Sequence, residues 1–447
     1  MFHHHTFRRS LLRSALFALA ASGTAACSSN SSPAAPFRTP APSVQRGTVD
    51  ALVRVTTITK AQMASDYFGA IALEVGGAPL CDVALYSVDY QTIGVRGEQA
   101  DASAAFFVPQ AGCTGPFPLI GYSHGTNLSR SQKITDPASV SFTDTAPDSS
   151  PVVVAALLAA HGYAVAATDY LGLGLSHYPF HPYLDAEAEA SAVVDSLRAA
   201  RASAKTLGVP LSGAVFLTGH SQGGQSSVAT QRAIERDEPG EFTLLGDAPS
   251  SGPYALTQTF LDSLAHQSQD APILATYILT SYQKIYGNVY AQPTDVFKLP
   301  YATNIASLLP VANYQQQDLL EGTTLPLSNA ALLQPAFVTS FETDAASGAR
   351  VDTAKNDLLG GWTPVAPLFL CGGSGDPEVE YKNATAAQAY FQSVGAKPAL
   401  VDVNAEVVAT GVPKTDYHVT VAFFCLAAAR ADFFDPIVKS AANHRHL

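Results

Sequence analysis

Short apolar runs alternate with helical patterns along most of this 447-residue chain, and this alternation constrains the fold more than any other feature. Short, mainly apolar runs of the kind that form buried parallel strands lie at residues 117–122, 164–168, 214–218, 243–245, 368–370 and 399–403. Stretches with helical spacing lie between them. Repeated strand–helix–strand units predict an α/β fold, in which helices cover both faces of a mostly parallel central sheet.

Start and stop signals define some of these elements more closely. Residues 83–93 and 102–108 are strand-like and are joined by a polar stretch that contains glycine, which predicts a hairpin at the edge of the sheet. Pro151 suits the first turn of a helix that Gly162 ends. Asp185 is a typical capping residue and predicts the start of a second, longer helix.

The first 27 residues have the pattern of an export signal, with Arg8 and Arg9 before a short apolar stretch and small residues before Cys27. The apolar stretch is too short for a permanent membrane span. The ordinary secretory route is favoured over the twin-arginine route, which the run R-R-S-L-L also resembles. Cys27 resembles a lipoprotein cleavage site, but Thr24 stands where that pattern usually has leucine, so lipidated and unlipidated forms both remain open.

Composition divides the rest of the chain into a tether, a core and an insertion. Residues 28–47 are rich in Ser, Pro and Ala and are expected to form a flexible tether. Between residues 249 and 361 the strand–helix alternation stops and only helical spacing remains. We interpret 249–361 as a helical cap inserted between two parts of an α/β core, 48–248 and 362–447. Such a cap lies over the strand ends, where open α/β sheets bind ligands, and its stretch 278–285 is expected to contact the ligand.

The cysteines point to disulfides. Four of the five cysteines follow the export signal, an even number for an oxidising compartment. We expect Cys81 to pair with Cys113, and Cys371 with Cys425, because each pair closes one local supersecondary unit. Four buried free thiols are the alternative.

The stretch L-T-G-H-S-Q-G-G-Q-S at 217–226 contains the pattern G-x-S-x-G around Ser221. An apolar run ends at Gly219 and a helical pattern follows, so Ser221 is predicted at a tight strand-to-helix turn. Such a turn leaves no room for side chains at positions 219 and 223, where glycine stands, and it exposes the serine hydroxyl above the sheet. This context indicates a nucleophile elbow rather than a connecting turn with an incidental serine.

A serine hydroxyl needs a base to become nucleophilic. His418, in the stretch T-D-Y-H-V-T, lies in a polar stretch directly before an apolar helix predicted at 419–434. His444 and His446 lie in a polar tail and are expected to be exposed. We therefore predict His418 as the base, with a structural core histidine as the alternative.

The base in turn needs a carboxylate that fixes its tautomer. Asp376 lies in a glycine-rich turn after a buried strand, between the serine and the histidine in the chain, which is the order found in α/β-hydrolases. Its rivals are Glu378, Glu380 and Asp402.

An oxyanion site needs two backbone amides. The amide of Gln222, directly after the serine, would supply one. The other is expected from the strand-to-turn stretch P-L-I-G-Y-S-H-G-T at 118–126, as the amide of Gly125 or Thr126, with His124 shaping the turn.

Several longer motifs carry a family resemblance. They are Y-S-H-G-T at 122–126, T-D-Y-L-G-L-G at 168–174, H-P-Y-L at 181–184, G-H-S-Q-G-G at 219–224, C-G-G-S-G-D-P at 371–377 and Y-H-V-T-V-A-F-F-C at 417–425. In these motifs the chain resembles the secretory lipase family of α/β-hydrolases, known from fungi and from bacterial relatives. The resemblance implies ester hydrolysis, a helical cap and no cofactor. Asp169 and Tyr170 are interpreted as residues that hold or line the site, and a purely structural role is equally open.

Charge and composition narrow the ligand. The net charge is -12 and no cluster of lysine or arginine occurs in the body of the chain, which argues against a nucleic-acid partner and favours a small-molecule or lipid ester substrate. We predict a bacterial lipase or esterase that is secreted, periplasmic or attached to the outer surface through a lipidated Cys27. It would use a Ser-Asp-His triad, an acyl-enzyme and no metal. A serine peptidase or amidase on the same fold is the alternative.

Overall fold

The computed structural model describes residues 45–136, 149–265, 268, 270–313, 316, 319, 320 and 322–444. The predicted export signal, most of the predicted tether and the lipidation candidate Cys27 lie outside the described residues. Arg46, which the sequence assigned to the tether, lies against the fold, with its Nε 2.9 Å from Oδ2 of the buried Asp195. Among the described residues there is no helix with the length and apolarity that crossing a membrane requires.

A nine-stranded sheet forms the centre of the fold, in the order β1-β2-β3-β5-β4-β6-β7-β8-β9. The pairs β1–β2, β2–β3 and β3–β5 are antiparallel, and all pairs from β5 to β9 are parallel. The strands are β1 Val49–Ile58, β2 Val83–Ile93, β3 Gln99–Pro109, β4 Phe117–Ser123, β5 Ala164–Thr168, β6 Leu211–His220, β7 Thr243–Ser250, β8 Phe369–Gly372 and β9 Ala399–Asp402. The predicted α/β fold with a mostly parallel sheet is confirmed.

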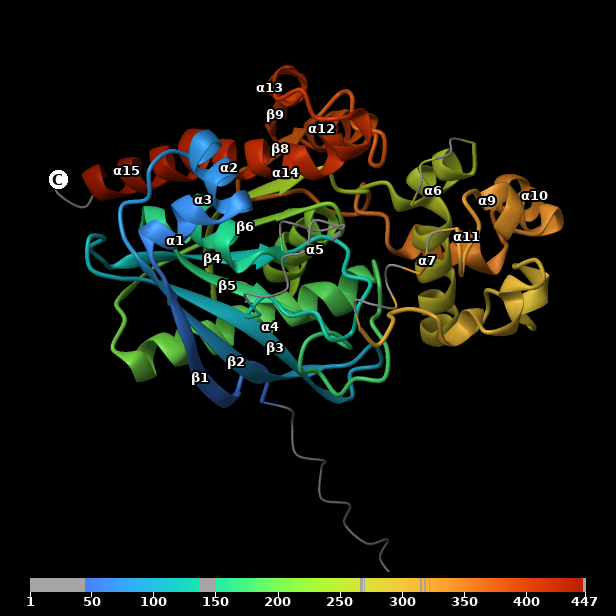
Figure 1. The fold of residues 1–447 in the computed structure, drawn as a ribbon, viewed down its shortest axis with the longest axis horizontal. Coiled ribbons are helices and arrows are strands. Elements are labelled where there is room, and N and C mark those ends of the chain that lie inside the picture. Colours follow the sequence, from blue (N-terminus) through green and yellow to red (C-terminus); the bar gives the residue numbers. More distant parts are fainter. Residues whose placement is uncertain are drawn as a thin grey trace, which may run out of the picture. The chain divides into compact units, whose positions relative to one another are not determined.

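Helices cover both faces of the sheet (Figure 1). One face packs against α1, α2, α3 and α14 in a single apolar cluster, and the other packs against α4, α5 and α12. The helices of these layers are α1 Lys60–Ser65, α2 Tyr67–Gly76, α3 Pro151–Leu157, α4 Ala186–Leu207, α5 Gln222–Asp237, α12 Lys382–Ser393, α13 Asn404–Ala409, α14 Tyr417–Ala428 and α15 Asp435–His444.

The predicted hairpin of β2 and β3 is present, but its place at the edge of the sheet is wrong. β1 pairs with β2 along its length and forms the edge instead. No strand was predicted there, because the side chains of β1 do not alternate cleanly between the core and solvent. Val53 is 57% exposed and Val55 39%, so two of its strongest strand formers face outward.

The helix boundaries differ from the prediction at two places. The helix that begins at Pro151 ends at Leu157, and a 3-10 turn, η2 Ala159–His161, continues to Gly162. α14 begins at Tyr417, two residues before the predicted start at 419, and passes into a π-helical turn, η7 Ala429–Phe434. His418 therefore lies inside the first turn of α14 and not before the helix.

The described residues between β7 and β8 form helices, 3-10 turns and isolated bridges around an apolar cluster of their own. The helices are α6 Leu256–Ala265, α7 Ala271–Tyr286, α9 Asn329–Leu332, α10 Pro335–Thr343 and α11 Gly348–Lys355, and the turns are η3 Pro293–Asp295, η4 Tyr301–Thr303 and η5 Ile305–Ser307. A further turn, η6 Lys414–Asp416, precedes α14. In Figure 1 the helices α6, α7, α9, α10 and α11 group at one end of the sheet. We keep the name cap for 249–361.

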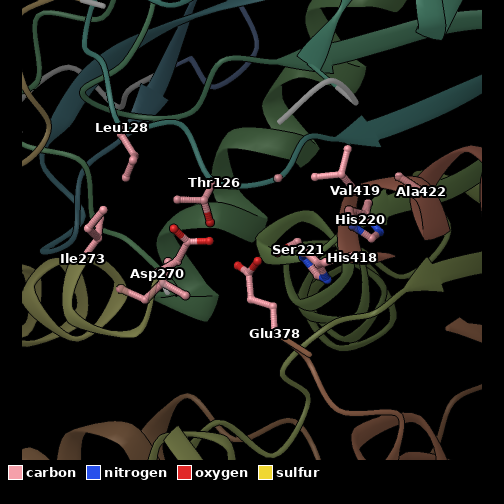
Figure 2. Close-up of a pocket in the computed structure, with 12 residues that line it drawn as sticks. Thr126, Leu128, His220, Ser221, Asp270, Ile273, Glu378, His418, Val419 and Ala422 are labelled. Carbon is pink, nitrogen blue, oxygen red and sulfur yellow. The ribbon is translucent and has the colours of Figure 1, made fainter. Parts of the chain in front are cut away.

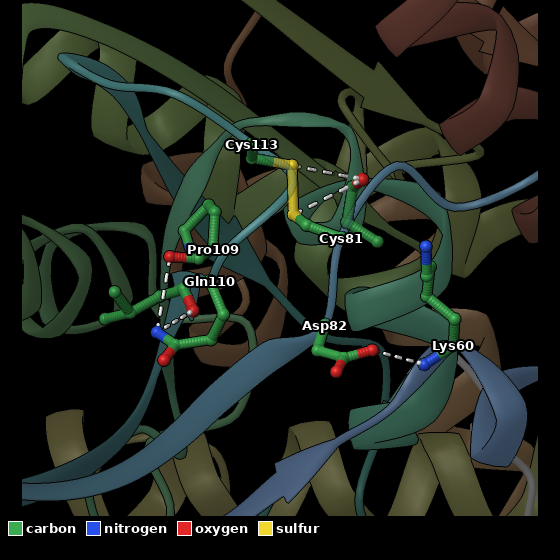
Figure 3. Close-up of a disulfide and its surroundings, with 8 residues drawn as sticks. Lys60, Cys81, Asp82, Pro109, Gln110 and Cys113 are labelled. Carbon is green, nitrogen blue, oxygen red and sulfur yellow. Dashed lines mark hydrogen bonds between the residues drawn. A yellow bond between two sulfur atoms is a disulfide. The ribbon is translucent and has the colours of Figure 1, made fainter.

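Both predicted disulfides are present. Cys81 is bonded to Cys113, which joins the segment before β2 to the segment after β3 (Figure 3). Cys371 on β8 is bonded to Cys425 on α14. The second disulfide fixes the strand that leads to Asp376 against the helix that carries His418.

Candidate active site

Ser221 lies at the turn between β6 and α5, and its backbone has φ 58° and ψ −122°. A non-glycine residue adopts this conformation at a cost, which is typical of a nucleophile held by the surrounding fold. A Cβ atom at Gly219 or Gly223 would collide with the carbonyl oxygen of Ser123, so only glycine fits at either position. The amide of Ser221 donates to the carbonyl of Ser250 on β7 at 2.9 Å, which fixes the turn against the neighbouring strand.

His418 and Asp376 are joined by a hydrogen bond, with 2.8 Å between Nδ1 and Oδ2. The other carboxylate oxygen of Asp376 accepts from the amides of Glu378 and Val379 at 2.9 and 3.1 Å. Burial opposes the ionisation of Asp376, but the interaction with His418 and these amides outweighs it, and the pKa of Asp376 is lowered. With an ionised carboxylate at Nδ1, that nitrogen carries the proton and Nε2 is the basic nitrogen of the ring.

Ser221 and His418 line the same cavity, which has an empty volume of about 440 Å³ (Figure 2). It is lined by Gly125, Thr126, Leu128, His220, Ser221, Asp270, Ile273, Leu274, Glu378, His418, Val419 and Ala422. Three of these residues, Asp270, Ile273 and Leu274, come from the start of α7 and the residue before it. Ile278, in the stretch expected to contact the ligand, is instead buried in the apolar cluster of the cap.

His220, which sequence reasoning did not single out, packs against His418 with 4.6 Å between the ring centres. Its Nδ1 lies 3.0 Å from the hydroxyl of Ser250. Burial lowers the pKa of His220 well below its ordinary value, and the nearby His418 adds to the shift. The ring is therefore uncharged and presents no competing cation to Asp376.

The rival carboxylates have other surroundings. Glu380 forms an ion pair with Lys382 at 2.9 Å. Asp402 accepts from the amides of Ser374 and Asn404 at 2.9 and 3.0 Å. Glu378 does line the cavity, where Figure 2 shows its carboxylate and that of Asp270 entering the same space. Burial raises the pKa of Glu378, His418 opposes this shift, and the negative charge of Asp376 adds to it.

Gln222 is the first residue of α5, and two hydrogen bonds hold its side chain in place. The side-chain amide donates to Nε2 of His181 at 2.8 Å and to Oε1 of Glu189 at 2.7 Å. His181 can accept because its Nδ1 is 2.9 Å from the carbonyl of Leu171 and donates there, and burial lowers its pKa to about 3.

The segment predicted to supply the second amide also lies at the cavity. Gly125 and Thr126 both line it. His124 does not, but its buried ring contacts the carbonyl of Gly125 through Nδ1 at 2.6 Å, and burial lowers its pKa to about 4. The contact ties the ring of His124 to this turn. Its role in shaping the turn and the choice between the amides of Gly125 and Thr126 stay predictions.

Asp169 and Tyr170 are not among the described residues that line the cavity. Asp169 accepts from the hydroxyl of Ser103 at 2.6 Å and from the amide of Ile134 at 2.9 Å, and burial raises its pKa to about 6. Tyr170 has a φ of 66°, and its hydroxyl donates to the carbonyl of His124 at 3.0 Å. Both residues support the segment that follows β4 from behind the site.

Within the described ranges, no three His, Cys, Asp or Glu side chains lie together as the ligands of a metal ion would. The cavity is lined by a serine on a strained turn and by an imidazole that is paired with a carboxylate. A serine hydrolase that works through an acyl-enzyme needs these groups.

Comparison with known proteins agrees with this chemistry. Residues 139–269 match the model of the secretory lipase family. The rice cell wall degrading esterase LipA from Xanthomonas oryzae is 36% identical, with a TM-score of 0.77 over 88% of this chain and 99% of that chain. Candida antarctica lipase A is 15% identical, with a TM-score of 0.57 over 85% of this chain and 83% of that chain, and shows the fold alone. A comparison with curated protein sequences gives no match. The chain therefore belongs to the secretory lipase family of α/β-hydrolases and is a carboxylic ester hydrolase.

Proposed function

We propose that this ester hydrolase works through a triad of Ser221, His418 and Asp376, with an acyl-enzyme on Ser221. The observation that carries the proposal is the 2.8 Å bond between His418 and Asp376 at a cavity that Ser221 also lines. Two elements far apart in the sequence, the turn after β6 and the start of α14, meet there. The lowered pKa of Asp376 supports its role as an ionised partner of the imidazole.

In the first half of the reaction, Oγ of Ser221 attacks the ester carbonyl carbon while Nε2 of His418 takes the hydroxyl proton. The resulting oxyanion is stabilised by the amide of Gln222 and that of Gly125 or Thr126. When the tetrahedral species collapses, the bond to the alcohol oxygen breaks and His418 passes its proton to that oxygen. Water, deprotonated by His418, then attacks the carbonyl carbon of the acyl-enzyme. The bond between that carbon and Oγ of Ser221 breaks, His418 returns the proton to Oγ, and the acid is released.

We further propose that the substrate is an uncharged ester with an apolar acyl group. Leu128, Ile273 and Leu274 offer apolar surface in the cavity. The carboxyl groups of Glu378 and Asp270 disfavour an anionic substrate there. The similar esterase from Xanthomonas degrades the rice cell wall, and an exported enzyme of this family would likewise meet esters outside the cytoplasm.

We propose export through residues 1–27, in line with the secretory family, either with lipidation of Cys27 or without it. Metabolic labelling with a radioactive fatty acid separates the two forms. Label that disappears in the Cys27→Ser variant supports the anchored form, and an unlabelled mature protein supports the released form.

Replacing Ser221 by Ala tests the triad. We expect kcat for p-nitrophenyl esters to fall by about 10⁴- to 10⁶-fold, because a triad acts as a unit and leaves only oxyanion and binding effects when broken. The thermal unfolding midpoint should change little, since alanine keeps the Cβ of the turn.

A panel of p-nitrophenyl esters from acetate to palmitate, with aminoacyl anilides beside it, tests the reaction class. Efficient anilide cleavage with weak ester cleavage would favour the peptidase or amidase alternative. A serine-directed phosphonate should label Ser221, and labelling of another serine would show that the nucleophile is assigned wrongly.

A further inference from the structure

Residues 181–184 form the H-P-Y-L motif, for which the triad mechanism has no role. These residues touch both sides of the proposed oxyanion site. His181 holds the side chain of Gln222, as described above. Tyr183 reaches the other side, where its hydroxyl lies 2.7 Å from Oγ1 of Thr126.

Which hydroxyl donates in the Tyr183–Thr126 hydrogen bond follows from the acceptors that are available to each of them. Tyr183 is 3% exposed, and in the part of the chain that the structure describes its hydroxyl has Thr126 as its hydrogen-bond partner. If Thr126 were the donor, the buried phenol proton would have no acceptor, and a buried donor without a partner is destabilising. Burial raises the pKa of Tyr183, so the phenol keeps its proton. Tyr183 therefore donates, and Thr126 accepts.

This direction leaves the proton of the Thr126 hydroxyl for another acceptor. Thr126 lines the cavity together with Ser221, and Figure 2 shows its hydroxyl pointing into that space. A hydroxyl that accepts from Tyr183 also becomes a better donor, because successive hydrogen bonds polarise each other. The carboxylates of Asp270 and Glu378 share this space and can accept from Thr126 in the free enzyme. A reaction at Ser221 would bring in a further acceptor, the oxygen of the tetrahedral intermediate.

The position of Tyr183 is fixed from the cap side. Its ring stacks on that of Tyr277 in α7, with 4.3 Å between the ring centres and 9° between the planes. Two further residues of α7 hold the same segment: Ser281 donates to the carbonyl of His181 at 3.2 Å, and Tyr282 donates to that of Leu184 at 2.9 Å. The phenol therefore cannot turn away from Thr126 without disturbing α7.

We propose that the Thr126 hydroxyl is a third, side-chain donor to the oxyanion, and that Tyr183 is the positioning residue that directs it. The proposal rests on the proposed function, since it needs an oxyanion formed at Ser221. It adds a hydroxyl to the two backbone amides of that site, and it assigns a role to the motif at 181–184.

The test uses three variants of the full chain with p-nitrophenyl butyrate. Thr126→Val removes the hydroxyl but keeps the shape and the backbone amide, and we expect kcat to fall about 10²-fold with KM within about threefold. Thr126→Ser keeps the hydroxyl and should retain at least about a third of kcat. Tyr183→Phe should lower kcat about tenfold, and should have no further effect once Thr126 is valine.

Tyr90→Phe is the matched control. Tyr90 is also buried and its hydroxyl also bonds a threonine, Thr168, at 2.7 Å, but it lies on β2 away from the cavity. It should alter stability and leave kcat unchanged. A second readout is the affinity of an alkyl boronic acid, whose tetrahedral adduct places an oxygen at the oxyanion position. This affinity should fall in parallel with kcat in Thr126→Val and in Tyr183→Phe.

The inference is overturned if Thr126→Val keeps kcat within threefold of the native enzyme, if Thr126→Ser is as impaired as Thr126→Val, or if the Tyr183→Phe effect adds fully to that of Thr126→Val. The proposed function fails differently. In that case Ser221→Ala would keep its activity, or the native protein would not cleave the ester.

Discussion

At the scale of single residues, the cavity combines the proposed nucleophile Ser221 with the acidic side chains of Asp270 and Glu378, and this combination predicts charge selectivity. Glu378 lines the cavity, lies two positions after Asp376 in the sequence, and has a pKa that burial raises. Its ionised form disfavours an ester that carries a negative charge, because like charges in a partly buried space repel.

Replacing Glu378 by Gln should therefore raise kcat/KM for an anionic ester, such as a p-nitrophenyl hemisuccinate, by about tenfold. The kcat/KM for the neutral butyrate ester should change much less. The sign of the pH effect follows from the raised pKa. As the pH rises through that pKa, the native enzyme gains the negative charge and should discriminate more strongly against the anionic ester. The Gln variant should show no such trend.

The ratio of kcat/KM for the two esters, measured from pH 5 to pH 9, checks this prediction. The ratio cancels any effect of pH on the triad, because both esters use the same nucleophile and base. A ratio that is equally independent of pH in both proteins would contradict the charge assignment of Glu378.

Residue-scale prediction from the sequence succeeds where the signal is local. Ser221 could be placed because the glycines at 219 and 223 and the flanking strand and helix lie within a few residues of it. His220, Glu378 and Tyr183 could not be given their surroundings in this way. Their partners come from other elements, so only the folded chain brings these contacts together.

At the scale of elements, the buried strands were predictable and the edge strand was not. β5 and β2 lie where the sequence placed them, because strands buried on both faces or in a regular hairpin have clear apolar patterns. β1 is half-exposed and has no such pattern. The start of α14 was placed two residues late, although Asp416, a typical capping residue type, is the N-cap of this helix; its side chain makes no cap hydrogen bond.

The two disulfides offer a prediction at this scale. The loops that they close span 32 and 54 residues, and chain-entropy arguments give each bond a similar stabilisation of about 4 kcal/mol. Only the bond between Cys371 and Cys425 joins elements that carry proposed triad residues. Loss of either bond should therefore lower stability to a similar extent, while activity should respond to the second alone.

We expect the double variant with Ala at 371 and 425 to lose about tenfold or more in kcat when assayed well below its unfolding midpoint, because a small shift between β8 and α14 misaligns Asp376 and His418. The double variant with Ala at 81 and 113 is the matched control and should keep its kcat. Urea unfolding measures the stability of both. Equal losses of kcat in the two variants would contradict a specific role of the second bond in aligning the triad.

At the scale of the whole molecule, α7 of the predicted cap meets the core in two ways. Its start supplies Ile273 and Leu274 to the cavity, whereas its middle packs on residues 181–184 through Tyr277 and its neighbours. The helical spacing of the cap was readable in the sequence, but which of its faces meets the cavity was not, because the whole of α7 is rich in apolar residues. The stretch 278–285 was therefore the wrong choice for the residues that contact the ligand.

The corrected geometry predicts how the cap sets acyl-chain preference. In the Ile273→Trp or Leu274→Trp variant, the indole ring should fill part of the cavity. A long acyl chain needs that space and an acetyl group does not. We therefore expect kcat/KM for p-nitrophenyl octanoate or palmitate to fall by about tenfold or more relative to that for the acetate. Ile278→Val is the matched control: it lies one turn further along α7, buried in the cap's own cluster, and should cost about 0.5–1.5 kcal/mol of stability without changing the preference.

The measurement is kcat/KM across esters from acetate to palmitate at substrate concentrations below micelle formation. A uniform loss across all chain lengths in the tryptophan variants would mean that Ile273 and Leu274 do not contact the acyl chain, and the acyl group would then have to lie on the other wall of the cavity, beside Val419 and Ala422 of α14.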